Sequence, residues 1–298
     1  MTMPSFGWVI TAAAKNAEDA GNLPRDNQRF IEKLSGKFEM IWVEDHLQWD
    51  DRPVLECWTA LVFLASRYPE FKFGPLVFGQ SYRNPALTAK MFATLYWLTE
   101  GRMVAGIGAG WKEDEYVSYG WPYPAAETRI GELEDAVQII RKLWTESPAT
   151  FKGKYFQIEE AYCEPMPSPP PPLLIAGGGE QLTLKLVAKF GDWMNVGFCK
   201  SEVYAQKLEA LRGHCTAIGR DYDEIKKTYF AFVSLNEDEF EPPGRSQPHL
   251  VMGNAQEVTK EFKQFIDLGV EHFMIRFVDF PSTKGLDLFL EKVMPQLS

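Results

Sequence analysis

The feature that most constrains the fold is an alternation, sustained along the chain, of short apolar segments with amphipathic helical segments. Apolar runs without polar alternation are typical of parallel strands buried on both faces. They occur at residues 6–10, 40–43, 71–78, 103–107, 173–176, 193–196, 228–235 and 272–278. Helical spacing separates them, at 27–34, 58–65, 85–98, 130–143, 182–189, 203–218, 258–268 and 286–293. The pattern predicts an α/β protein in which residues 1–298 form one (β/α)8 TIM barrel, a fold of about 250 residues.

One long interruption separates the fourth strand from the fifth. Residues 144–172 carry Pro165, Pro167 and four consecutive prolines at 169–172. Proline lacks the N–H that an inner strand or a helix requires, so an extended excursion is expected before the fifth strand. This proline-rich excursion is either a wall or lid of the site or a stiff connector without a role in catalysis.

Charge and cysteine usage exclude several classes of function. The net charge of −10 argues against general nucleic-acid binding and against an anionic membrane surface as partner. No segment has the length of a transmembrane helix, and the start lacks the pattern of a signal peptide. The four cysteines are far apart, which favours neither a zinc site nor a disulfide framework. We therefore expect a soluble cytoplasmic protein with reduced thiols and no metal.

The fourth expected strand leads into alternating glycines. Gly106, Gly108 and Gly110 allow the backbone to bend and to lie close to a flat ligand, and Trp111 adds a large ring. Active sites of α/β barrels are built at the carboxyl ends of the strands, so Gly108, Ala109 and Trp111 are expected to contact a ligand. The third glycine comes one residue too early for a dinucleotide fingerprint, which leaves a nicotinamide-binding doubly wound sheet as a minor interpretation.

His46 is the strongest single candidate for a catalytic residue. It follows the second strand directly, and a neutral imidazole exchanges a proton readily near pH 7. A structural role is the alternative for a lone histidine. Asp45 either orients His46 or caps the next turn, and Glu115 with Arg129 is expected to form a structural ion pair near the loop.

Two further features favour an anionic ligand. Three glycines, Gly177, Gly178 and Gly179, lie between the fifth expected strand and the next helix. Their backbone amides are exposed beside the positive helix end, which suits a phosphate, although a tight turn explains the same pattern. Arg276, near the end of the eighth strand, either binds a phosphate or pairs with a carboxylate inside the barrel.

An ordered series of motifs spans about residues 6–195, roughly two thirds of the chain. It resembles the bacterial-luciferase-like flavin oxidoreductases, and most closely the branch that depends on the deazaflavin coenzyme F420. The motifs are Glu44-Asp45-His46-Leu47, Leu55-Glu56-Cys57-Trp58-Thr59, Gly74-Pro75-Leu76-Val77, Tyr82-Arg83-Asn84-Pro85-Ala86, Gly101-Arg102, Gly106 to Trp111, Glu115-Tyr116, Gly120, Arg129, Phe151-Lys152-Gly153, Ile175 to Gly179, and Asp192 with Asn195.

The resemblance implies a flavin-type ring, from F420 or from FMN, across the carboxyl mouth of the barrel. It places His46 near the reactive centre of the ring and a non-prolyl cis peptide at Leu76–Val77 behind it. It assigns the glycines at 177–179 to the phosphate. It also implies a homodimer formed through helices on one side of the barrel.

Three functions follow from the resemblance. The first is F420-dependent hydride transfer to or from a small organic substrate. The second is a two-component monooxygenase that uses O2 and FMN reduced by a separate flavin reductase. The third, of another class, is a flavin-binding barrel without turnover. Some deazaflavin dehydrogenases carry a glutamate where this chain has Trp111, which weakens a sugar-phosphate dehydrogenase assignment. The substrate is expected to be selected by the carboxyl-terminal third and the proline-rich excursion.

Overall fold

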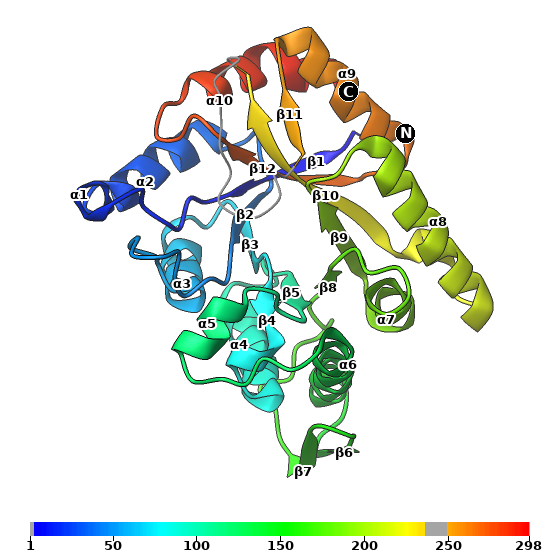
Figure 1. Ribbon diagram of the computed structural model, residues 1–298. Helices are drawn as coiled ribbons and strands as arrows, with labels where there is room; N and C mark the ends of the chain where they lie inside the picture. Colours follow the sequence, from blue (N-terminus) through cyan, green and yellow to red (C-terminus); the bar gives the residue numbers. More distant parts are fainter. Residues whose placement is uncertain (1–2, 236–248, 298) are drawn as a thin grey trace.

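The computed structural model describes residues 3–235 and 249–297, in which parallel strands form a barrel with helices outside it (Figure 1). The strands are β1 (Ser5–Val9), β2 (Met40–Val43), β3 (Lys72–Pro75), β4 (Phe78–Gly79), β5 (Ala105–Gly108), β6 (Ala149–Lys152), β7 (Gln157–Ala161), β8 (Leu173–Ala176), β9 (Trp193–Gly197), β10 (Lys226–Ser234), β11 (Leu250–Met252) and β12 (His272–Phe277).

The strand order confirms the expected barrel. Neighbouring strands follow the order β3-β2-β1-β12-β10-β9-β8-β5-β4, with β11 paired to β10. The circle closes beside β5, where Phe73 of β3 pairs in parallel with Met103. There the Phe73 N–H donates to the Arg102 carbonyl at 2.9 Å, and the Val104 N–H donates to the Phe73 carbonyl at 2.9 Å.

The third strand differs from the expected continuous segment at 71–78. Its first part, β3, pairs with β2, whereas its second part, β4, pairs with β5. Pro75 ends β3 and has no N–H to donate to a ladder, so the chain changes its pairing partner at Leu76 and Val77. The Leu76 N–H still donates to the Val43 carbonyl at the end of β2 at 2.8 Å, and beyond this bond the chain pairs with β5.

The helices match the expected segments closely, and α4 has the predicted bounds. They are α1 (Ala17–Ala20), α2 (Leu23–Leu34), α3 (Cys57–Arg67), α4 (Pro85–Leu98), α5 (Glu113–Ser118), α6 (Ala126–Leu143), α7 (Thr183–Phe190), α8 (Ser201–Ile218), α9 (Ala255–Asp267) and α10 (Lys284–Leu288), with the short 3-10 helices η1 (Gln80–Tyr82), η2 (Tyr222–Glu224) and η4 (Met294–Gln296) and the π-helix η3 (Phe289–Val293).

The first helical region begins earlier than expected. The polar stretch before Asn27 contains α1 and the first turn of α2. Asn16 caps α1 by accepting a hydrogen bond from the Asp19 N–H at 2.9 Å, and Pro24 lies in the first turn of α2, where proline is tolerated. Local capping thus overrides the turn-like composition.

Trp42 fills the interior of the barrel. A Cβ on Gly7 would lie 2.3 Å from Trp42 Nε1, and one on Gly74 would lie 2.5 Å from Trp42 Cζ3, so both positions require glycine. Trp42 Nε1 donates to His272 Nε2 at 3.0 Å, which leaves the proton on His272 Nδ1 to face Ser5 Oγ at 2.7 Å. Burial lowers the pKa of His272 to about 3, so this histidine is a neutral structural residue.

The proline-rich excursion contains an antiparallel hairpin, β6–β7, which Figure 1 shows projecting beside α6. Asp135 of α6 holds it, because its Oδ2 atom accepts hydrogen bonds from the Tyr155 N–H at 2.6 Å and the Phe156 N–H at 3.1 Å. The hairpin is therefore anchored to the outside of the barrel.

Two features are absent from the described ranges. No helix there has both the length and the apolarity needed to cross a membrane. No group of three or more histidine, cysteine, aspartate or glutamate side chains is arranged there to hold a metal ion.

Candidate active site

A cavity of about 1280 Å³ lies at the carboxyl ends of the barrel strands. Its lining includes the segments that follow β2, β5, β8, β9 and β12. Most residues selected from the sequence contribute to it, namely His46, Leu76, Val77, Gly108, Ala109, Trp111, Gly177, Gly178 and Arg276. The carboxyl mouth of the barrel is thus the place where these separate segments meet.

Two sequence expectations do not match this lining. Gly179 lies outside it, and its carbonyl accepts a hydrogen bond from the Leu184 N–H at 3.0 Å in the first turn of α7. The proline-rich excursion, residues 144–172, contributes no lining residue either. The hairpin packs on α6 outside the barrel, and the role of the excursion as wall, lid or connector stays a prediction.

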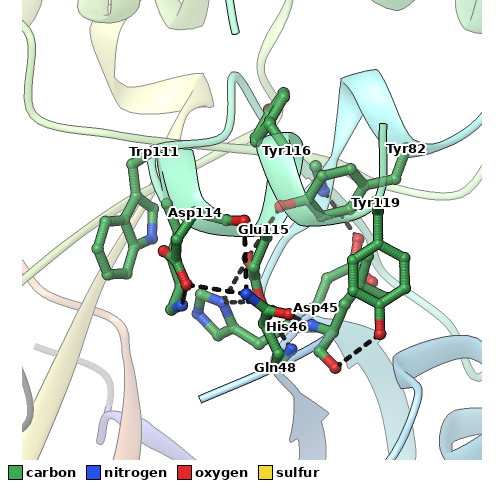
Figure 2. A network of polar contacts seen from close by, with 12 residues as sticks. Asp45, His46, Gln48, Tyr82, Trp111, Asp114, Glu115, Tyr116 and Tyr119 are labelled. Carbon is green, nitrogen blue, oxygen red and sulfur yellow. Dashed lines mark hydrogen bonds and ion pairs between the residues drawn. The ribbon is translucent and has the colours of Figure 1, made fainter. Parts of the chain in front are cut away.

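Glu115 organises the polar part of the site (Figure 2). The side chain of Glu115 comes from α5 and is only 1% exposed. Its Oε1 atom accepts hydrogen bonds from the Leu47 N–H at 2.7 Å and the Gln48 N–H at 3.2 Å, and its Oε2 atom accepts one from Tyr82 Oη at 2.9 Å. Burial raises the pKa of Glu115, but these bonds and His46 outweigh it, so the pKa lies below its usual value.

His46 is held by the same carboxylate. His46 Nδ1 lies 3.2 Å from both oxygens of Glu115. An ionised carboxylate only accepts hydrogen bonds, so in the neutral imidazole Nδ1 carries the proton and Nε2 keeps its lone pair. Because the His46 side chain lines the cavity, this arrangement supplies a base at the carboxyl mouth.

Asp45 does not orient His46. Its carboxylate is fully buried and receives two hydrogen bonds from Arg83, at 2.7 and 2.9 Å, and one from the Gly79 N–H at 2.9 Å. Burial raises the pKa of Asp45 even though the Arg83 guanidinium opposes that shift. Asp45 therefore ties the end of β2 to the start of η1 and fixes the frame on which His46 is mounted.

Two tryptophans surround the imidazole. The His46 ring centroid lies 4.8 Å from that of Trp49 and 5.6 Å from that of Trp111, and the two indole rings are 6.0 Å apart. Trp111 is 63% exposed and comes from the loop that leads into α5. The imidazole is thus in contact with two indole rings.

The expected Glu115–Arg129 ion pair is wrong. Glu115 is committed to His46, and the Arg129 guanidinium lies 4.1 Å from the ring centroid of Tyr123. The role of Glu115 could have been suspected from two facts together. It follows the strand exit at Gly108–Gly110, and it shares the carboxyl mouth with the histidine that follows β2.

Arg276 pairs with a carboxylate, which is the second of the two roles that the sequence suggests for it. Its Nη2 atom lies 2.5 Å from Glu44 Oε2 and also donates to the Ile10 carbonyl at 2.7 Å. Its Nε atom is buried without a hydrogen-bond partner in the structure. Arg276 is therefore an ion-paired residue at the carboxyl mouth.

The glycines at the carboxyl mouth have separate functions. A Cβ on Gly106 would lie 2.1 Å from the Pro75 carbonyl oxygen, and one on Gly108 would lie 2.8 Å from Val77 Cγ2, so these glycines allow β5 to pack against the segment at 75–77. The Leu76–Val77 peptide bond is cis, as the resemblance implies. Gly177 has a φ of +135°, a backbone conformation that only glycine adopts readily.

Comparison with known proteins decides the family. The model of the luciferase-like monooxygenase family matches residues 4–241, which is most of the chain. The chain belongs to this family. It is 28% identical to the F420-dependent glucose-6-phosphate dehydrogenase of Intrasporangium calvum, over 87% of this chain and 90% of the relative. It is 30% identical to the enzyme of the same name from Mycolicibacterium smegmatis, over 80% and 71%.

Solved structures of other oxidoreductases share the fold. An F420-dependent secondary alcohol dehydrogenase in complex with an F420-acetone adduct has a TM-score of 0.85, with 21% identity and full coverage of both chains. The EDTA monooxygenase from Chelativorans sp. BNC1 has a TM-score of 0.81, with 15% identity and coverage of 99% and 93%. The predicted luciferase-like TIM barrel is therefore confirmed.

Proposed function

We propose that this luciferase-like barrel is an F420-dependent oxidoreductase that transfers a hydride to or from a small organic substrate. The observation that carries the proposal is the His46–Glu115 pair, which holds an imidazole in the lining of a large cavity at the carboxyl mouth. The relatives named F420-dependent, which match most of the chain, favour this cofactor over FMN.

The lining of the cavity fits an anionic cofactor. The chain carries a net charge of −10, yet the lining contains six lysine and arginine side chains against five aspartates and glutamates. Gly177 and Gly178 would lie against the phosphate, and Leu76 and Val77 offer an apolar surface for the ring. Arg276 belongs to the same lining, but it is paired with Glu44, so we do not assign it to the phosphate of the cofactor.

When bound, the deazaflavin supplies a ring that accepts or returns a hydride. His46 Nε2 takes the proton of a substrate hydroxyl in the oxidative direction and returns it in the reductive direction. The Glu115 carboxylate stabilises the imidazolium that forms, and its two backbone hydrogen bonds hold it in place. Trp49 and Trp111 limit the access of water to the imidazole.

Titration of the purified protein with F420 and with FMN tests the cofactor. Micromolar binding of F420 is expected, with a quench of tryptophan fluorescence because Trp49 and Trp111 line the cavity. His46→Ala is expected to lower turnover at least ~10²-fold while it leaves F420 binding intact. Failure of both cofactors to bind would contradict the proposal, and unchanged turnover of His46→Ala would return His46 to a structural role.

The family description and the EDTA monooxygenase neighbour favour one alternative, an FMN-dependent monooxygenase that requires O2 and a separate flavin reductase. Binding of FMN alone in the same titration, together with oxygen consumption when a reductase is added, would support it. Stoichiometric binding of a flavin that no donor reduces would instead support a non-catalytic flavin-binding barrel.

We infer that the protein is a homodimer that associates through α3 and α4. These adjacent helices carry apolar side chains in solvent, among them Phe63 (57% exposed), Leu87 (54%) and Leu98 (65%). Sedimentation is expected to give twice the chain mass, and Phe63→Glu combined with Leu98→Glu is expected to give monomers. We further propose a cytoplasmic location, in keeping with four cysteines that are all free.

A further inference from the structure

We propose that the substrate of this site is an uncharged compound with an aryl or alkyl group, such as a secondary aryl alcohol or the matching ketone, and not a sugar phosphate. This inference rests on the proposed function, because it names the substrate class of the same cavity. It is carried by the side chains on the wall of the cavity formed by β9, β10 and β12, opposite His46.

Three phenylalanines form this wall. Phe198 follows β9, and its ring centroid lies 4.6 Å from that of Phe230 and 4.8 Å from that of Phe232, both in β10. All three side chains line the cavity. Phenyl rings offer no hydrogen-bonding atom, so they favour contact with apolar groups and leave sugar hydroxyls or a phosphoryl group unsatisfied.

The backbone conformation of Phe198 also supports an apolar substrate. Its φ is +59°, in the left-handed region where a bulky residue is uncommon and glycine is the usual choice. Its N–H donates to the Phe230 carbonyl at 3.2 Å, and its carbonyl accepts from the His249 N–H at 3.2 Å. The surrounding structure holds an unfavourable conformation that keeps a phenyl ring at the cavity, as is found at functional sites.

The cation nearest the wall is already neutralised. The Arg276 guanidinium lies 6.0 Å from the ring centroid of Phe230 and 5.7 Å from that of Phe232. Glu44 pairs with its Nη2 atom at 2.5 Å. A phosphoryl group requires a cation with charge to spare, and Arg276 provides it only if the ion pair with Glu44 is broken.

The opposite side of the cavity is aromatic as well. His46 is flanked by Trp49 and Trp111. The nearby Lys112 is paired with Asp114. A substrate that places its reacting carbon beside His46 therefore meets apolar rings on both sides.

Binding measured without turnover tests this inference. Tryptophan fluorescence of the protein, with and without bound F420, is titrated with 1-phenylethanol and with glucose 6-phosphate. We expect 1-phenylethanol to bind at least ~10-fold more tightly, and Phe198→Ala to weaken its binding about tenfold through loss of one aromatic contact. Phe198→Leu should retain most of the affinity, and the exposed Tyr162→Ala, outside the lining, should retain all of it.

A second variant addresses the charge. Glu44→Gln frees Arg276 from its partner, so glucose 6-phosphate is expected to bind several-fold more tightly than it binds to the wild-type protein. Tighter binding of glucose 6-phosphate than of 1-phenylethanol by the wild type would overturn the inference, as would an unchanged affinity of a folded Phe198→Ala protein for 1-phenylethanol. If 1-phenylethanol binds but neither F420 nor FMN does, the cofactor proposal fails while the apolar site stands.

Discussion

Replacing Glu115 with glutamine changes one atom of the site and is expected to reverse the tautomer of His46. The glutamine oxygen keeps the place of Oε1, because the N–H groups of Leu47 and Gln48 require an acceptor there. The glutamine NH2 group then occupies the place of Oε2 and donates one hydrogen to Tyr82 Oη and the other to His46 Nδ1. His46 Nδ1 becomes an acceptor, the proton moves to Nε2, and the base that faces the cavity is lost.

The magnitude follows from the two roles of the carboxylate. General base catalysis contributes about 10²- to 10⁴-fold, so kcat of Glu115→Gln is expected to fall within that range while KM changes little. Hydrogen bonds to a charged group contribute about 1.5–3 kcal/mol, against about 0.5–1.5 kcal/mol for neutral ones. The bonds from the Leu47 and Gln48 N–H groups both change from a charged to a neutral acceptor, so a summed loss of about 2–3 kcal/mol in the free energy of unfolding is expected. Steady-state F420 absorbance and urea unfolding measure the two effects.

The tautomer itself gives a readout that a purely structural role would not change. Nitrogen NMR of protein labelled in its four histidines reports which ring nitrogen carries the proton, and His46→Ala assigns the signal. The wild-type protein is expected to show protonated Nδ1, and Glu115→Gln protonated Nε2. The same tautomer in both proteins, with kcat within threefold, would refute the reasoning.

Three other predictions follow from the site and its frame. The pKa of Glu115 is depressed in the folded protein, so its carboxylate stabilises the fold fully above the ordinary glutamate pKa of about 4.3. This stabilisation is lost as pH falls through the folded-state pKa, so the stability of Glu115→Gln should fall less steeply with pH during acid unfolding. Arg83→Ala should cost about 3–5 kcal/mol in urea unfolding because it leaves a buried carboxylate unpaired, whereas Arg29→Ala at an exposed pair should cost under about 1 kcal/mol. Gly177→Ala should weaken F420 binding at least ~10-fold in a fluorescence titration, whereas Gly213→Ala, with open space at its Cβ, should not.

Much of the fold could be predicted from local sequence, because buried parallel strands and capped helices leave short-range patterns. The start of α4 is an example, since the Asn84 side chain accepts from the Ala86 N–H at 2.9 Å and Pro85 occupies the first turn. The rule that parallel strands carry their sites at their carboxyl ends placed His46, Gly177 and Arg276 at one cavity.

The partner choices within the site could not be predicted, because they depend on contacts between distant parts of the chain. Glu113 and Asp114 point to solvent whereas Glu115, in the same acidic run, is buried, and the run itself does not indicate which of the three turns inward. The bond from Glu115 to His46 spans 69 positions. The choice of Arg276 between a phosphate and Glu44 was likewise settled only by the packing of the barrel.

Glu115 also joins two loops mechanically. The loop after β2 carries the base, the loop after β5 carries α5, and one side chain from the second loop satisfies two backbone amides of the first. Gln48 and Tyr119 add cross-links between the same loops, from Gln48 Nε2 to Asp114 Oδ2 at 3.1 Å and from Tyr119 Oη to the Leu47 carbonyl at 3.3 Å. A mutation that moves α5 therefore also displaces the imidazole of His46. New substrates can be accommodated without loss of this base only by substitutions in the opposite wall, which is formed by β9, β10 and β12.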